Sequence, residues 1–328
     1  MLQARAQPVR ALLLATAACV VFDAPNALAQ AYPTKPIRVV VGAAPGSNTD
    51  FFCRAVAPSM SATLGHQLIP DYRVGGGGVF GAATTAKAAP DGYVIGITSS
   101  GFVIYPALVK NLTFDPLRDF TPLGHVVNVP QALVIHPSLP VKTVKDLIAF
   151  ARARPGQLNC GNAGVGTNAH LAAVLFNQVA RVDIVHISYK STPPVMMDLL
   201  TGEIHMTFPS ISGVLGHARS GRMRMLAQTG KARSATVADV PTMQEAGLLG
   251  FSMESRFGLV GPANLPPAIA EKLNAALVKA VQDPATRKLL LDSGADPLGG
   301  TPQDQMAFTK AEIERWLEVT KKAGMKPE

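Results

Sequence analysis

The segment IRVVVGAAPGSNTD, residues 37–50, decides the fold class of this chain. Its first five residues form a short apolar run bounded by turn residues, which is typical of a buried β-strand. Residues 42–48 are rich in Gly, Pro, Ser and Asn and predict a loop. A helical pattern begins near Thr49 and ends at Gly65. The segment therefore predicts a strand, a loop and a helix start in immediate succession.

The same succession recurs along the chain. Further strands are expected at residues 68–69, 93–98, 132–135, 158–161, 183–187, 204–208, 223–228 and 257–260. Helices are expected to reach residue 87 and to cover residues 141–153, 169–179, 193–200, 266–282 and 303–322, with Thr143 as an N-cap. Strands that alternate with helices indicate parallel α/β layers. A chain of this length predicts roughly two domains.

The first 29 residues have the pattern of a cleavable secretory signal peptide. Arg5 and Arg10 precede a short apolar run at residues 11–22, and Ala-Leu-Ala at residues 27–29 is a small-x-small cleavage signal. The apolar run is too short for a membrane span, which needs about 20 residues. We therefore expect cleavage after Ala29 and export to the periplasm.

The charge of the chain limits the classes of partner that we expect it to bind. The formal net charge is +8, but Lys and Arg are scattered and no aromatic–basic platform stands out, so nucleic acid is not expected. A basic surface is equally consistent with an anionic solute or with solubility.

Two cysteines lie after the expected signal peptide, Cys53 and Cys160. Export permits a disulfide, although we interpret both as free, buried thiols.

Two loops share an unusual composition. Residues 45–50 and residues 164–168 each combine Gly with hydroxyl and amide side chains, and each precedes a helix start. Free N–H groups and the helix dipole favour an anion at such a place, and Gly lets the backbone approach a ligand. Ordinary N-capping by Asn48, Thr167 or Asn168 is the alternative for each loop alone. As a pair facing one cleft, they predict capture of an anionic group.

Candidates for catalysis are weak. Cys160 and His170 could form a thiol–imidazole pair, but no orienting group is evident. His170 lies in the first turn of a helix, which suits a neutral imidazole in a structural or ligand-contacting role. Asp50 is the one acid in a candidate loop and could stabilise the helix start or accept a donor from the ligand. We expect no enzymatic activity.

Motifs for metals and cofactors are also missing from the sequence. It contains no His-x-x-x-His, no Cys-x-x-Cys and no Gly-x-Ser-x-Gly. The four glycines at residues 75–78 fit neither a P-loop nor the dinucleotide fingerprint. They predict either a flexible turn or backbone that approaches a ligand. We expect no cofactor and no metal.

Motifs in a specific order link the chain to a known family. They are YPTKPIR at 32–38, PGxxTD at 45–50, AAPDGY at 88–93, DPxxDF at 115–120, GxGTxxHLA at 164–172, IVHxxYK at 184–190, DVPTxxEAG at 239–247 and FGL at 257–259. In these features the chain resembles the tripartite tricarboxylate transporter receptor family, the Bug-type periplasmic solute-binding proteins. The similarity covers nearly all of the chain after the expected signal peptide.

The resemblance implies a two-domain periplasmic-binding-protein fold of the Venus-flytrap, type II kind, with a ligand cleft between the domains and two crossover strands. Residues 30–130 and 255–328 would form domain 1, and residues 131–254 domain 2. Ligands of similar proteins are mostly small carboxylates, held by loop N–H groups and ordered water. The partner would be an integral membrane permease, and nothing demands more than a monomer.

The expected ligand-binding residues combine the two loops with nearby strand ends and helix starts. They are Pro45, Gly46, Ser47, Asn48, Thr49, Asp50, Gly77, Ser99, Ser100, Gly166, Thr167, Asn168, His170, Lys190 and Ser210.

The sequence departs from the family pattern in its first loop. Residues 43–50 read AAPGSNTD where Phe-Pro-Pro-Gly-Gly-Gly-Thr-Asp is usual, so an aromatic wall is lost and two polar side chains are gained. Pro209-Ser210 stands where an acid is often seen. These changes leave the ligand class open. Two other functions stay open: sensing for a membrane sensor kinase, or an exported enzyme that uses Cys160 or Asp50.

Overall fold

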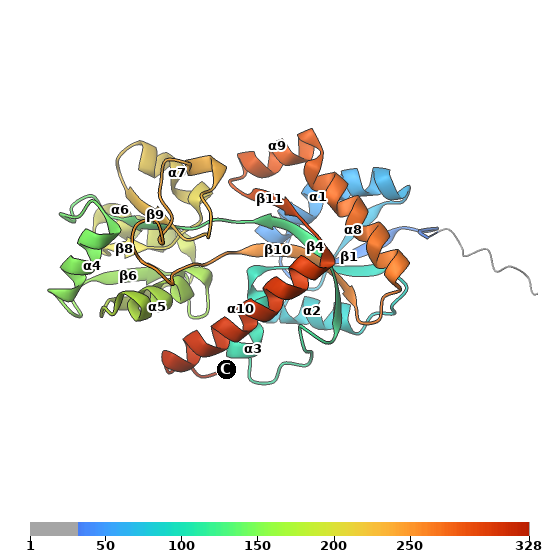
Figure 1. Cartoon of the computed structure of the whole chain (residues 1–328), viewed down its shortest axis with the longest axis horizontal. Coiled ribbons are helices and arrows are strands. Elements are labelled where there is room, and N and C mark those ends of the chain that lie inside the picture. Colours follow the sequence, from blue (N-terminus) through green and yellow to red (C-terminus); the bar gives the residue numbers. More distant parts are fainter. Residues whose placement is uncertain (1–31, 328) are drawn as a thin grey trace, which may run out of the picture. The chain divides into compact units, whose positions relative to one another are not determined.

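The computed structural model describes residues 32–327 of the chain (Figure 1). The expected signal peptide, residues 1–29, lies outside the described residues. Within the described part, the strands form two separate sheets. No helix in this part is both long enough and apolar enough to cross a bilayer.

The six-stranded sheet has the order β11-β4-β10-β3-β1-β2. Its strands are β1 (Ile37–Val41), β2 (Leu68–Tyr72), β3 (Val94–Thr98), β4 (Phe120–Asn128), β10 (Arg256–Pro262) and β11 (Asp296–Gly299). β1 pairs in parallel with β2 and β3, whereas β10 is antiparallel to β3 and β4, and β11 is antiparallel to β4. The expectation of parallel layers is therefore wrong for half of this sheet. The reason is topological, because the chain leaves the sheet along β4 and returns along β10.

The five-stranded sheet has the order β7-β6-β8-β5-β9. Its strands are β5 (Ala132–Ile135), β6 (Asn159–Asn162), β7 (Val185–Ser188), β8 (Met206–Thr207) and β9 (Arg224–Gln228). β6 is parallel to β7 and β8, and β5 is antiparallel to β8 and β9. All these strands fall within residues 131–254, and those of the other sheet fall outside them. The division into two domains at these limits stays a prediction.

Helices fill most of the connections. They are α1 (Asn48–Leu64), α2 (Val79–Ala86), α3 (Tyr105–Leu108), α4 (Val144–Arg152), α5 (Asn168–Ala180), α6 (Thr192–Thr201), α7 (Ile211–Arg219), α8 (Pro267–Gln282), α9 (Pro284–Asp292) and α10 (Pro302–Lys322). Short 3-10 turns lie at Gly76–Gly78, Ser100–Val103 and Ala235–Val237.

The capping residues explain where several helices begin and end. Thr143 caps α4 as expected, in a capping box with Asp146. α1 ends at Gly65, whose φ of 76° is a left-handed conformation that Gly adopts without strain. Its N-cap is Ser47, not Asn48 as the capping alternative for this loop had it, because the Ser47 hydroxyl accepts from the N–H of Asp50. α1 also continues through Pro58.

The last helix ties the C-terminal segment to the five-stranded half. α10 contacts β4 and α3, and Figure 1 shows it as a long helix running towards α5. Trp316 is buried in the same core cluster as Leu133 and Phe208. The Gln178 side chain of α5 donates to the carbonyl of Val319 at 2.8 Å. The two sheets are therefore linked by α10 as well as by β4 and β10.

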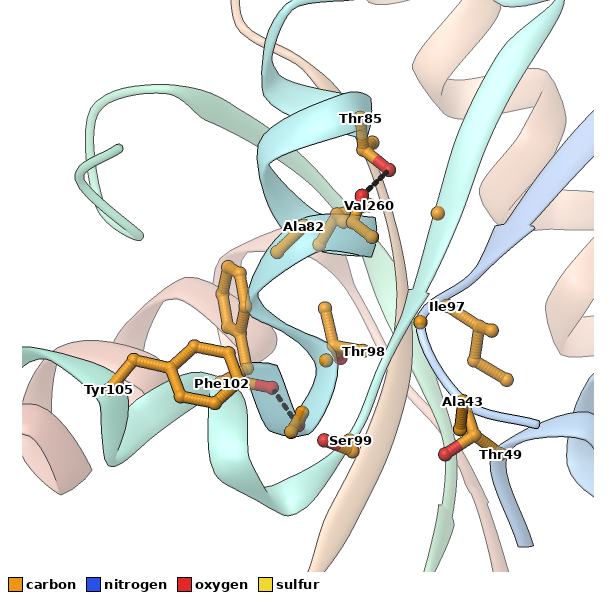
Figure 2. Close-up of a pocket in the computed structure, with 15 residues that line it drawn as sticks. Ala43, Thr49, Ala82, Thr85, Ile97, Thr98, Ser99, Phe102, Tyr105 and Val260 are labelled. Carbon is orange, nitrogen blue, oxygen red and sulfur yellow. Dashed lines mark hydrogen bonds between the residues drawn. The ribbon is translucent and has the colours of Figure 1, made fainter. Parts of the chain in front are cut away.

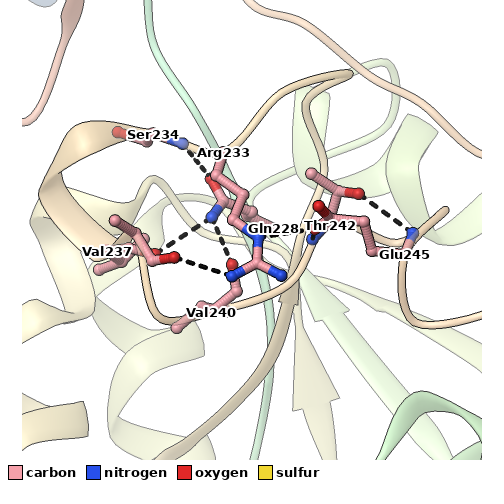
Figure 3. A network of polar contacts seen from close by, with 8 residues as sticks. Gln228, Arg233, Ser234, Val237, Val240, Thr242 and Glu245 are labelled. Atoms are coloured by element: carbon pink, nitrogen blue, oxygen red, sulfur yellow. Dashed lines mark hydrogen bonds and ion pairs between the residues drawn. The ribbon is translucent and has the colours of Figure 1, made fainter.

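A polar network holds the turn-rich stretch between β9 and β10 (Figure 3). The buried Gln228 side chain donates to the carbonyls of Val237 and Val240 and accepts from the N–H of Ser234. Arg233 pairs with Glu245 at 2.8 Å. Glu245 also accepts from the Thr242 N–H. The DVPTxxEAG motif therefore has a structural role, since its acid and threonine hold a turn.

Candidate functional site

A cavity of about 250 Å³, here called the first cavity, lies at the carboxyl ends of β1 and β3 (Figure 2). Thr49 of α1 and Gly78, the N-cap of α2, both line it, so two helices begin beside it. Phe102, Tyr105 and Val260 form an apolar wall. The first N–H groups of a helix have no partner within the helix and are available to a ligand. The first cavity therefore offers backbone donors and an apolar side.

Glycines allow the backbone to close around the first cavity. A Cβ on Gly81 would lie 2.5 Å from the Cα of Gly42, and a Cβ on Gly42 would lie 3.0 Å from the Cα of Gly78. All four residues of the 75–78 segment have positive φ, which favours Gly. The Tyr105 hydroxyl donates to the carbonyl of Gly77 at 2.8 Å and fixes the segment. Gly77 and Gly78 thus bring backbone to the wall of the first cavity, while an approach of this segment to a ligand stays a prediction.

Two polar side chains of loop 45–50, those of Ser47 and Asp50, form hydrogen bonds within the loop and with its surroundings. The buried Asp50 carboxylate accepts from the Gly46 N–H at 2.8 Å, the Arg54 guanidinium at 2.8 Å and the Tyr72 hydroxyl at 2.7 Å. Burial acts to raise the pKa of Asp50, but these donors outweigh it and hold the pKa below its usual value. Asp50 is therefore ionised and stabilises the loop and the start of α1.

A second cavity, of about 260 Å³, lies beside the five-stranded sheet. α5, α6 and α7 all begin at it: Asn168 and Ala169 come from α5, Thr192 from α6, and Ser210 is the N-cap of α7. Gln131 and Thr207 add polar side chains, and Val195, Met196 and Phe208 add an apolar wall. The second cavity therefore combines helix starts with polar lining residues.

His170 positions the loop that leads into α5. Its Nδ1 accepts from the Gly166 N–H at 3.2 Å, and its ring lies edge-on to His186 at 5.4 Å. Burial, aided by His186, lowers the pKa of His170, so the imidazole is neutral near pH 7. Thr167 is the N-cap of α5, as one of the sequence alternatives had it. His170 thus acts through the loop.

A third cavity, here called the bridging cavity, has a volume of about 490 Å³ and shares walls with the other two. Gly77, Ser99 and Tyr105 line it together with the first cavity, and Thr167 and Asn168 together with the second. The Asn168 side chain donates to the hydroxyls of Ser100 and Ser255, both at 2.9 Å. The bridging cavity therefore adjoins both of the others, and Asn168 lines both the second and the bridging cavities.

The structure brings together only part of the residues predicted for the site. Those that line the three cavities are Thr49, Gly77, Ser99, Ser100, Gly166, Thr167, Asn168 and Ser210. Those that line none of the three are Pro45, Gly46, Ser47, Asn48, Asp50, His170 and Lys190. Ligand contacts by any of them stay a prediction. Lys190 is exposed between β7 and α6.

Several lining residues were not predicted. Tyr105, Phe102 and Gln131 lie on the walls but follow no motif that points to a ligand. Gln131 stands just before β5, and only the three-dimensional pairing of that segment with Ser210 brings it to the second cavity. The one signal in the sequence that could have identified Gln131 as a lining residue is its position directly after the expected crossover between the domains.

No residue that lines the three cavities carries a formal charge at neutral pH. Within residues 32–327, no group of His, Cys, Asp and Glu side chains is placed to hold a metal ion. Cys53 and Cys160 are free and buried, as expected. Burial raises the pKa of the Cys160 thiol, which is fully buried and therefore poorly suited to act as a nucleophile.

The comparisons with known proteins agree with this geometry. Residues 52–325 match the family described as tripartite tricarboxylate transporter family receptor. The structure of the periplasmic binding protein BugD is similar with a TM-score of 0.72 and 31% identity, over 90% of this chain and 100% of that one. Rpa4515 of R. palustris, solved with adipate, has a TM-score of 0.75 and 34% identity, over 90% and 100%. MatC of Rhodopseudomonas palustris, solved with malate, has a TM-score of 0.71 and 29% identity, over 88% and 99%.

Two α/β halves joined by paired crossover strands, with the structural neighbour BugD, define a periplasmic binding protein fold. The chain belongs to the tripartite tricarboxylate transporter receptor family. Both the predicted fold class and the resemblance to this family are confirmed.

Proposed function

We propose that this protein is a periplasmic receptor that captures a small carboxylate-bearing solute between its two halves and presents it to a tripartite tricarboxylate-type permease. The observation that carries the proposal is the row of three adjoining cavities, of which the first and the second lie at helix starts beside different sheets. Helix starts stabilise anions through free N–H groups and the helix dipole. The adipate and malate complexes of two family members support a carboxylate ligand.

The absence of charged side chains from the cavity walls shapes the binding mode. A buried carboxylate without an opposite charge needs several hydrogen bonds. The N–H groups at the starts of α1 and α2 would supply them in the first cavity, with Thr49 and Ser99 hydroxyls beside them. We therefore place the carboxylate of the solute in the first cavity. This binding chemistry does not require Arg or Lys, and it needs no catalytic group.

Closure of the two halves would give the ligand-bound receptor a shape that a membrane partner can recognise. The chain crosses between the sheets along β4 and β10, and Asn168 already joins the halves through Ser100 and Ser255. Rotation about paired strands is a familiar way for a two-part receptor to close on a ligand. A permease would then recognise the closed form.

Calorimetry of the protein purified without its first 29 residues tests the proposal. It would be titrated with a panel of mono- and dicarboxylates, and with amides of the same chain lengths as uncharged controls. We expect saturable one-to-one binding of at least one carboxylate and no binding of fully uncharged analogues. Mass spectrometry of solutes released from natively purified protein provides an independent list of candidates. No saturable binding to any carboxylate would contradict the proposal.

A further inference from the structure

Two histidines of the described residues are buried, His125 and His170, and their hydrogen bonds differ. Both ring nitrogens of His125 lack a hydrogen-bond partner within this part of the chain, whereas Nδ1 of His170 accepts from the Gly166 N–H at 3.2 Å. A ring nitrogen accepts a hydrogen bond only when it carries no proton, so the contact with Gly166 requires a neutral imidazole. Protonation of one side chain therefore decides whether this contact exists.

The loop held by this contact, residues 164–168, lies against the segment that follows β3. A Cβ on Gly166 would lie 3.0 Å from the Cδ1 of Leu108, so the backbone of the loop closely approaches that side chain. Asn168, at the end of the loop, donates to the hydroxyl of Ser100 at 2.9 Å. Residues 165–168 all line the bridging cavity. The position of the loop therefore sets one wall of the candidate site.

The surroundings of His170 keep its imidazole neutral near pH 7. Burial, aided by the ring of His186 in β7, lowers the pKa of His170 below its usual value of about 6.5. α5 itself carries no Asp, Glu, Lys or Arg, and Asp183, just before β7, acts to raise the pKa of His186. Release of the loop would expose the ring of His170 to water and let its pKa return towards the usual value. The held loop is therefore favoured above about pH 6.5 and is lost as the pH falls through the lowered pKa.

We propose that His170 is a positioning residue for solute capture: its neutral imidazole holds the loop at residues 164–168 against the segment that follows β3, and its protonation releases the loop and the solute. The inference rests on the proposed function, because residues of this loop line the bridging and the second cavities. In the protonated ring, an N–H group would face the N–H of Gly166, and two donors cannot bond to each other. The receptor then holds its solute near neutral pH and releases it in acid.

Nuclear magnetic resonance of the solute-free protein tests the contact itself. The ring of His170 and the amide of Gly166 would be followed from about pH 7.5 to about pH 5, across the usual pKa of histidine. We expect both signals to change together in the wild type. His170→Asn offers an amide oxygen in place of Nδ1 and does not titrate, so its Gly166 signal should stay constant. A Gly166 amide that stays constant in the wild type, or that still titrates in His170→Asn, overturns the inference.

Calorimetry with adipate and with malate, the acids present in the structures of two relatives, tests the effect on capture. From about pH 7.5 to about pH 5, the affinity of the wild type should fall about three- to tenfold relative to His170→Asn, which is the effect of one hydrogen bond. The ratio between the two proteins cancels the titration of the acid itself. At the higher pH, His170→Leu, which has no acceptor, should bind about three- to tenfold more weakly than His170→Asn.

His186→Asn is the matched control, because it changes the neighbouring imidazole and leaves the contact between His170 and Gly166 in place. It should keep the loss of affinity in acid and move it to higher pH, since a charge on His186 no longer opposes the protonation of His170. If His186→Asn removes the pH dependence, or if wild type and His170→Asn respond alike to pH, the inference is overturned and the carboxylate receptor stands. If neither these two acids nor the rest of the carboxylate panel bind at any pH, the proposed function fails, and the resonance experiment still decides whether His170 holds the loop.

Discussion

The first and second cavities are both built at helix starts, but they present different chemistry to a solute. Around the first cavity, glycines bring the backbone close, and the buried Asp50 carboxylate is already bonded to Gly46 and Arg54. The lining of the second cavity includes the polar residues Gln131, Asn168 and Ser210. Backbone N–H groups can donate to any carboxylate, whereas polar side chains add donors and acceptors of their own. Under the proposed function, the contrast predicts that the six-stranded half contributes most of the affinity for the solute and the five-stranded half most of the selectivity.

The largest expected effect comes from adding a side chain where two backbone segments meet beside the first cavity. Gly81→Ala would place a Cβ 2.5 Å from the Cα of Gly42, so the backbone must shift. We expect the free energy of unfolding to fall by about 1–3 kcal/mol and solute binding to be lost. Gly216→Ala is the control, because Gly216 is an exposed helical glycine with nothing within 4 Å. It should stabilise the protein by about 0.5–1 kcal/mol in urea unfolding; equal effects of the two would refute the close-packing explanation.

Removal of the Asp50 charge should weaken the first loop in a pH-dependent way. Asp50→Asn is expected to lower stability at pH 7 by about 1–3 kcal/mol, because the N–H of Gly46 and the hydroxyl of Tyr72 lose a charged acceptor. The pKa of Asp50 is lower in the folded protein than its usual value near 3.9. Its stabilisation is therefore present above that pH and is lost as the pH falls through the lowered pKa.

Urea unfolding from pH 7 to pH 3 measures this effect. The difference between wild type and Asp50→Asn should shrink below about pH 4. Asp292→Asn removes an exposed partner of Lys288 and should change stability by less than about 0.5 kcal/mol at every pH. A difference between wild type and Asp50→Asn that stays constant over this range would show that the carboxylate is not the stabilising form.

Truncation of Asn168 should separate binding from folding. Asn168→Ala removes the hydrogen bonds to Ser100 and Ser255 and a wall of both the second and the bridging cavities. We expect about tenfold weaker solute binding and a loss of stability of about 1 kcal/mol. Asn177→Ala, in the same helix, removes a bond to the Ile184 carbonyl away from the cavities. The Asn177→Ala control should lower the free energy of unfolding by a similar amount and leave the affinity for the solute unchanged. If it weakens solute binding as much as Asn168→Ala does, Asn168 has no central role in binding.

The smallest effect is expected for Cys160→Ala. The thiol is fully buried in β6 and lines none of the three cavities. Solute affinity measured by calorimetry should stay within about twofold, with a modest loss of stability from the small cavity left behind. Loss of a measurable turnover in this variant would instead support the enzymatic alternative.

The sequence was most informative where a local signal and the tertiary structure agree. The strand at residues 37–41, the helix ending at Gly65 and the cap at Thr143 follow from apolar runs, a left-handed glycine and a capping box. β4 gave no such signal, because Pro122, Gly124 and His125 interrupt its apolar pattern. α7 includes Gly213 and Gly216, which are poor helix formers. Tertiary packing decides these elements.

The candidate site could be predicted only in part, because its side chains are also placed by tertiary structure. Composition marked the loops at residues 45–50 and 164–168, since Gly beside hydroxyl and amide side chains is unusual. Composition does not reveal which way a side chain points, and Ser47 and Asp50 turn inward to cap and hold their own loop. Gln131 reaches the second cavity only through pairing with Ser210, which lies far along the chain.

Hydrogen exchange of the wild-type protein, with and without the tightest acid found by calorimetry, tests the shared site most directly. We expect the acid to slow exchange in both halves at once, at residues 42–49 and 76–79 around the first cavity and at residues 167–170 and 131 around the second. Peptides from the Arg233–Glu245 turn, which lies outside the three cavities, should be unchanged. Protection confined to one half, or none at saturating acid, would contradict capture of the solute between the two halves.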